Sequence, residues 1–222
     1  MDARDVAAYL KSHPEFFENY ADLLAQVLIP DPHGGHAISI TDRQLGNLRE
    51  RTKKLEAKLA ELLHFGEEND AIGEKLHRLG VALVGAEDFA AVLAACYYHL
   101  DNDFAVPHVT LRLWGLDAAP GEEDRPEFAP PDAATLSFAA ALKHPHCGPA
   151  SKLEELTWLA PTVRSVAILP LHYRAGTMGL LALGSEELHR FYPEMGTLFL
   201  SRLSDLASTA LWRTLQVAQL SP

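Results

Sequence analysis

Residues 166–185, VAILPLHYRAGTMGLLALGS, contain two apolar runs on either side of a short turn at Arg174-Ala175-Gly176. Two such runs joined by a short turn are typical of a β-hairpin. A hairpin with one face in water alternates apolar and polar residues, and that alternation is almost missing here. Both faces of the hairpin must therefore be covered, either by other parts of the chain or by a bound molecule.

The segments around the hairpin predict an α+β domain over residues 69–222. Residues 108–115, HVTLRLWG, alternate cleanly and indicate a strand. Helical periodicity marks residues 72–83, 89–100, 133–144 and 194–216, and a Pro-rich acidic loop occupies 116–132. The expected order is helix, helix, strand, loop, helix, hairpin, helix, which gives an antiparallel sheet with helices on both faces.

A narrow leucine pattern precedes this domain. It follows the a and d positions of a heptad over Leu45, Leu48, Thr52, Leu55, Leu59 and Leu62. A helix that lies on its own domain usually has a wider apolar stripe. We term this pattern the leucine seam; it predicts a coiled-coil helix over 41–68. The simplest assembly is a parallel homodimer with Leu45, Leu48, Leu55, Leu59 and Leu62 in its interface.

Two further points concern this helix: what its leucines pack against, and how it continues after Leu63. The seam leucines could instead pack within the chain, against a helix at 14–28. Gly66 and Gly73 weaken the pattern beyond Leu63, where we expect a bend or break before the next domain.

Residues 1–40 predict a helical head and a linker. Residues 2–28 read as two short helices with a broad apolar face, which either packs on the chain itself or docks a partner. Residues 30–40, PDPHGGHAISI, form the linker. His33 and His36 lie in it, but no third metal ligand of suitable spacing lies nearby.

The net charge and the number of cysteines indicate which binding partners and which cellular compartment to expect. The formal net charge of -11 argues against a nucleic-acid surface, and the most basic stretch, 49–58, is interleaved with Glu50 and Glu56. Two cysteines cannot build a disulfide framework. The N-terminus has no signal-peptide pattern, and the longest apolar run, 89–100, is too short to span a bilayer. We expect a soluble, cytoplasmic protein with no membrane or nucleic-acid partner.

The hairpin and its flanking helices resemble the GAF domain. In that fold the hairpin carries Pro-Leu near the end of its first strand and Gly-Leu/Val-Leu after the turn. Pro170-Leu171 and Gly179-Leu180-Leu181 stand in those places here. The resemblance implies that the first and last helices cover one sheet face, while the other face lines a ligand pocket.

A second resemblance extends over nearly the whole chain. The segments that carry it are HPEFF, ISITDRQLGNLRERTKKLEAKL, HCG at 146–148, and PLHYRAGTMGLLALGS followed by RFYPEMGT. Together they are similar to domain-of-unknown-function family 484, a bacterial family that joins a helical head to a GAF-like domain. This resemblance supports the predicted organisation and implies no activity, ligand or cofactor.

Catalytic chemistry finds little support. The Asn-Lys…Phe…Asp-Glu signature of cyclic-nucleotide-binding GAF domains is missing, and no phosphate loop or nucleophile elbow occurs. Cys147 lies beside His144 and His146, which leaves open an activated thiol, pigment attachment or a metal site. The alternative is a loop with a small half-buried cysteine. Cys96 lies on an apolar helix face, so a resolving pair like that of GAF-like methionine sulfoxide reductases is not expected.

Binding is the remaining interpretation. On strand 108–115 the aliphatic residues Val109, Leu111 and Leu113 should face the helical core. The candidate ligand contacts on the other side are Thr110, Arg112, Trp114, Phe138 and Cys147. A fixed guanidinium suits a carboxylate or phosphate, and an indole offers a stacking surface. The alternative partner for Arg112 is Glu122 or Glu123.

The sequence therefore predicts a non-enzymatic sensory or regulatory module. A small molecule in the GAF-like pocket would act through a dimeric helix on a partner protein. The first alternative is a structural adaptor that recruits a partner through its helical head and holds no ligand. The second is a cysteine-dependent enzyme that uses Cys147.

Overall fold

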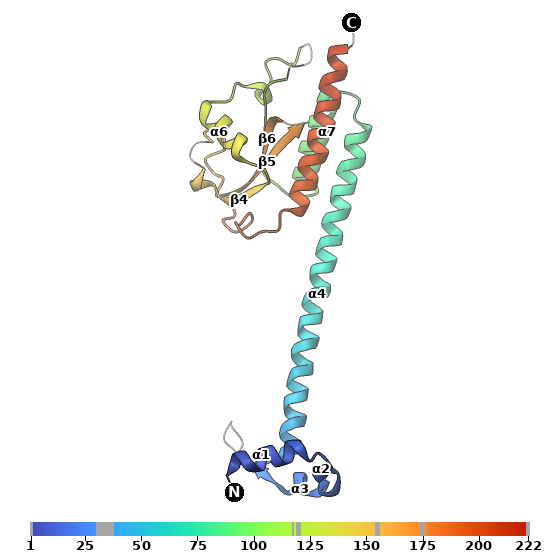
Figure 1. Ribbon diagram of the computed structural model, residues 1–222. Coiled ribbons are helices and arrows are strands. Elements are labelled where there is room, and N and C mark those ends of the chain that lie inside the picture. The colour runs from blue at the N-terminus through green and yellow to red at the C-terminus, as the bar shows by residue number, and fades with distance from the viewer. Residues whose placement is uncertain are drawn as a thin grey trace. The chain divides into compact units, whose positions relative to one another are not determined.

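The computed structural model describes residues 2–29, 38–116, 118, 121–153, 156–173 and 176–220 (Figure 1). The linker histidines His33 and His36, and Arg174-Ala175 of the hairpin turn, lie outside these residues. The chain divides into two compact units, Met1–Glu67 and Glu68–Pro222. Helix α4 contributes to both units.

The first unit holds short elements and the beginning of a long helix. They are α1 (Ala3–Ser12), α2 (Glu15–Asn19), α3 (Ala21–Gln26), an antiparallel pair of β1 (Leu28–Ile29) and β2 (Ile38–Ser39), and the start of α4. Asp2 and Asp5 form a capping box that begins α1. The prediction of two helices is wrong, because the backbone leaves the helical region at Tyr20 (φ -127°, ψ 41°) and separates α2 from α3.

Helix α4 (Ile40–Gly85) runs for 46 residues without interruption. The helix continues into the second unit as expected and has no break near Gly66 and Gly73, because a glycine in a helix costs only about 1 kcal/mol and does not by itself end it. Five leucines of the seam are 47–63% exposed: Leu45, Leu48, Leu55, Leu59 and Leu62. No described part of the same chain covers them, which contradicts the alternative of packing within the chain.

The second unit is built on a four-stranded antiparallel sheet. Its strands are β3 (His108–Leu113), β4 (His146–Pro149), β5 (Ser165–Tyr173) and β6 (Gly176–Ser185), in the order β3-β6-β5-β4. The predicted hairpin is the β5–β6 pair at the centre of the sheet. Strand β4 was not expected: the sequence HCGP was interpreted as a loop, but it pairs with β5 along the sheet edge.

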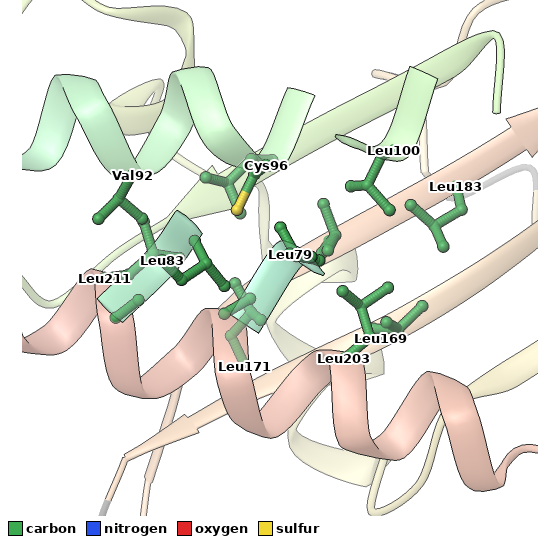
Figure 2. Close-up of a cluster of buried hydrophobic side chains, with 14 of the residues drawn as sticks. Leu79, Leu83, Val92, Cys96, Leu100, Leu169, Leu171, Leu183, Leu203 and Leu211 are labelled. Atoms are coloured by element: carbon green, nitrogen blue, oxygen red, sulfur yellow. The ribbon is translucent and has the colours of Figure 1, made fainter. Parts of the chain in front are cut away.

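Three helices cover the first sheet face: the C-terminal part of α4, α5 (Phe89–Asn102) and α7 (Leu198–Leu220). Figure 2 shows leucines of these helices and of the strands in one cluster, among them Leu79 of α4, Leu169 and Leu171 of β5, and Leu211 of α7. These four side chains have 0–1% of their surface exposed. This cluster is the larger of the two that hold the unit together.

The chain itself also covers much of the second sheet face. A smaller cluster packs there against α6 (Ala133–Ala141) and against the segment that follows the 3-10 helix η2 (Ala150–Lys152). Its buried members are Ala139, Leu153, Leu156, Val163, Val166, Ile168, Leu180 and Ala182. Both faces of the central hairpin are therefore dry, which explains why its sequence lacks polar alternation.

The long helices carry charge along their length. Among the helices that the structure describes, none has a stretch apolar and long enough to pass through a bilayer.

Candidate ligand cavity beside Arg112

Strand β3 divides its side chains between the two clusters as the alternation predicts. Leu111 and Leu113 are buried in the first cluster and Val109 packs against it, whereas Trp114 packs against the second cluster. Arg112 lies opposite Leu180, a member of the second cluster, in the β3–β6 ladder. This confirms the prediction of which side chains of the strand face each side of the sheet. The opposite assignment would place the guanidinium of Arg112 among aliphatic helices.

The Arg112 guanidinium has two contacts on this face. Its Nη1 donates a hydrogen bond to the carbonyl oxygen of Pro126, and its Cζ lies 5.8 Å from the centre of the Trp158 ring. Among the described residues Glu122 pairs with Arg125, and neither Glu122 nor Glu123 forms an ion pair with Arg112. Among the residues that the structure describes, the positive charge of Arg112 therefore has no carboxylate partner.

A cavity of about 280 Å³ lies against Arg112. Its lining consists of Arg112, Ala129, Pro130, Pro131, Asp132, Thr135, Thr157 and Trp158. Asp132 is the N-cap of α6 and accepts a hydrogen bond from the Thr135 amide at 2.7 Å, which holds the pKa of this carboxyl below its usual range. The Trp158 indole Nε1 lies 3.3 Å from the Thr135 hydroxyl oxygen, to which it donates. The lining of the cavity therefore includes both a cation, Arg112, and a carboxylate, Asp132.

A buried pair supports the segment that holds Arg112. Glu127 belongs to the 3-10 helix η1 (Pro126–Phe128) and is 5% exposed. It accepts a hydrogen bond from the Tyr97 hydroxyl of α5 at 2.8 Å. Burial, and then the hydrogen bond to Glu127, raise the pKa of Tyr97. This contact ties η1 to α5 and so fixes the Pro126 carbonyl that orients Arg112.

The structure does not bring the other predicted contacts to this cavity. Thr110 is half-buried on the same strand, and it does not line the cavity. Trp114 lines a separate surface pocket together with Thr177. Phe138 packs against the second cluster, with its ring 6.3 Å from that of His146.

Cys147 lies on the opposite side of the sheet, in the first cluster. Neighbouring residues of a strand point to opposite faces, so exposed His146 and buried Cys147 cannot bind one ion together. Burial raises the pKa of the Cys147 thiol to about 11 and that of Cys96 to about 12. Both thiols are free and buried.

Sequence reasoning found only Arg112 among the eight lining residues of the cavity, and the residues that it missed include Asp132, Thr135 and Trp158. Asp132, Thr135 and Trp158 come from the start of α6 and from the turn after η2. One signal was available, since an Asp directly before a predicted helix is a typical N-cap. Trp158 had none, because the segment around it has no periodicity.

Comparison with known proteins shows the fold and the family. A free methionine-R-sulfoxide reductase from Neisseria meningitidis, solved in complex with its substrate, superposes with a TM-score of 0.50 at 16% identity, over 66% of this chain and 91% of that one. The fold is thus GAF-like. The uncharacterized protein YigA of Salmonella typhimurium is 25% identical over 214 residues, which are 92% of this chain and 88% of the relative. The model of the family described as "Protein of unknown function, DUF484" matches residues 1–214, and the chain belongs to that family.

Proposed function

We propose that this protein is a non-enzymatic regulatory module that binds a small polar anion in the cavity beside Arg112. The observation that carries the proposal is a guanidinium at the edge of a cavity, held against Trp158 and without a carboxylate partner in the described part of the chain. A fixed guanidinium recognises carboxylate and phosphate groups through paired hydrogen bonds. A volume of about 280 Å³ is near the lower end for small-molecule sites, which favours a compact metabolite.

The state of the cysteines supports a non-enzymatic role. A Cys-dependent reaction needs an exposed thiolate near an activating base. Cys147 is 4% exposed and its thiol pKa is raised to about 11, so it stays protonated near neutral pH. The enzyme alternative that uses Cys147 is therefore the least supported of the three.

The proposal includes a homodimer formed along α4. The exposed leucine seam needs a cover, and the heptad continues beyond it with glycine at three successive a positions: Gly66, Gly73 and Gly80. Gly73 and Gly80 line an apolar groove between α4 and α7, beside Val81 and Val84, which are 59% and 79% exposed. An added Cβ at Gly80 would lie 3.7 Å from Leu206 Cδ1, so this glycine lets α7 of the same chain pack closely against α4.

Two charged residues of α7 also border this groove. Arg202 and Asp205 of α7 lie on its border, one turn apart and of opposite sign. A helix pair that changes its packing when the cavity fills would carry the signal to the helical head and a partner protein.

One observation favours the structural adaptor instead. Most of the second sheet face is filled by the chain's own side chains, including Leu153, Leu156 and Val163. In an adaptor, the remaining space beside Arg112 holds no specific molecule and the helical head alone recruits the partner. The two functions differ in whether a small molecule stabilises the protein through Arg112.

Thermal unfolding with a panel of acidic metabolites and nucleotides tests the proposal. A ligand at a hundredfold excess over its Kd stabilises the native state by about 2.7 kcal/mol. For a domain of this size that corresponds to a rise in Tm of roughly 5–10 °C. We expect at least one such compound for the wild type, and loss of its effect in Arg112→Ala.

Arg125→Ala is the matched control, because it removes a neighbouring cation that does not line the cavity. The control should respond as the wild type does. A compound that stabilises Arg112→Ala equally would remove Arg112 from the site. A panel without any stabilising compound would favour the adaptor.

A further inference from the structure

A second cavity, of about 320 Å³, lies on the helical side of the sheet. It is bordered by α4, the end of α5, β6 and the start of α7. Most of its lining is apolar: Ile72, Leu100, Phe104, Val106, Leu183, Phe191, Met195, Phe199, Leu200 and Leu203. Leu100, Leu183 and Leu203 are at most 3% exposed, so the cavity reaches into the first cluster.

The polar groups of this cavity are two cations, Lys75 and Arg190. The Lys75 ammonium lies 5.9 Å from the centre of the Phe104 ring. The Arg190 Nη2 donates to the Phe104 carbonyl oxygen at 2.6 Å, and its Cζ lies 5.7 Å from the centre of the Phe191 ring. Both cations therefore contact Phe104 from within the same cavity lining.

Neither cation has a carboxylate partner among the described residues. The nearby acidic group Asp103 is already engaged, since it accepts from Arg78 at 3.0 Å and lies 2.6 Å from His99. Both contacts lower the pKa of Asp103. Two uncompensated positive charges beside an apolar cavity leave an anionic group as the missing complement.

The backbone at this cavity is also unusual. Ala105, between the lining residues Phe104 and Val106, has a φ of +51°, in the left-handed region that residues with a Cβ seldom adopt. This conformation follows the end of α5 and turns the chain back, so that the Val106 amide donates a hydrogen bond to the Leu100 carbonyl oxygen at 2.9 Å. A left-handed residue followed by this six-to-one hydrogen bond is a common way for a helix to end, so the cap of α5 accounts for the conformation.

We propose that this cavity binds an amphipathic monocarboxylate, with its carboxylate between Lys75 and Arg190 and its aliphatic tail among the leucines. Burial of the tail and charge-assisted hydrogen bonds to the head group act on the two ends of one molecule. The site is separate from the Arg112 cavity, because it lies on the other face of the sheet. It also touches α4 through Ile72 and α7 through Leu200, the two helices that border the groove of the proposed dimer.

Isothermal titration of the full chain with octanoate tests this site, with 1-octanol as the same tail without charge and acetate as the same head group without a tail. We expect one octanoate per chain, and at least tenfold weaker binding of octanol and acetate. Lys75→Gln and Arg190→Gln should each weaken octanoate at least tenfold and leave octanol unchanged. Arg202→Gln, which removes a cation outside this cavity, should bind octanoate as the wild type does.

Arg112→Ala separates this site from the proposed function and should leave octanoate binding unchanged. Equal affinities for octanoate and octanol would overturn the proposal. So would unchanged octanoate binding in Lys75→Gln, or the absence of saturable binding to the wild type. None of these outcomes depends on the Arg112 cavity.

Discussion

Replacing Gly179 with alanine is expected to lower the free energy of unfolding by about 3 kcal/mol, the upper part of the usual range for overpacking. A Cβ at this position would lie 2.3 Å from the Arg112 carbonyl oxygen and 2.8 Å from Leu113 Cδ2. The first of these atoms is backbone of the paired strand β3. The Arg112 carbonyl oxygen cannot move away without disturbing the hydrogen bonds between β3 and β6. Urea-induced unfolding should therefore show a large decrease in the free energy of unfolding.

Gly176→Ala is the matched control on the same strand. A Cβ there meets nothing within 4 Å, so its stability should stay within about 0.5 kcal/mol of the wild type. Because Arg112 belongs to the displaced strand, Gly179→Ala should also weaken any ligand that needs the guanidinium. Equal stabilities of the two variants would show that β3 and β6 do not approach as closely as described.

Leu55→Glu is expected to convert a dimer into monomers. Leu55 lies at a d position of the seam and is 63% exposed in the single chain. In a parallel coiled coil each d residue packs against its counterpart, so the substitution places two carboxylates in an apolar interface. Light scattering should show the mass falling from twice the chain mass of 24.4 kDa to the chain mass itself.

Ala57→Glu adds the same charge to the outer face of the helix, at an f position, and should leave the dimer intact. The coiled-coil prediction fails if Leu55→Glu has the same mass as the wild type. It fails equally if the wild type is already monomeric at micromolar concentration.

The central sheet could be predicted because its constraints are local. The apolar runs of β5 and β6 predicted a hairpin covered on both faces, and the charge of Arg112 fixed the parity of β3. Strand β4 was missed because four residues with Gly148 and Pro149 carry no strand periodicity. Its pairing with β5 forms only in the tertiary structure.

The candidate site was predictable only in part for the same reason. Arg112 could be placed from its own strand, whereas Asp132, Thr135 and Trp158 reach it from segments whose path the sequence does not determine. Cys147 was a candidate contact because His144 and His146 lie beside it and because a pocket cysteine holds the pigment in some GAF domains. Strand alternation on β4 instead directs its thiol into the first cluster.

Native mass spectrometry of the full chain, purified without denaturation, tests the central claim most directly because one spectrum reports both subunit number and bound mass. A regulatory module of the proposed kind should appear as a dimer that carries one small molecule per chain. Arg112→Ala should remain a dimer and lose that additional mass. A wild-type spectrum of bare monomers, or the same additional mass on both proteins, would contradict the account.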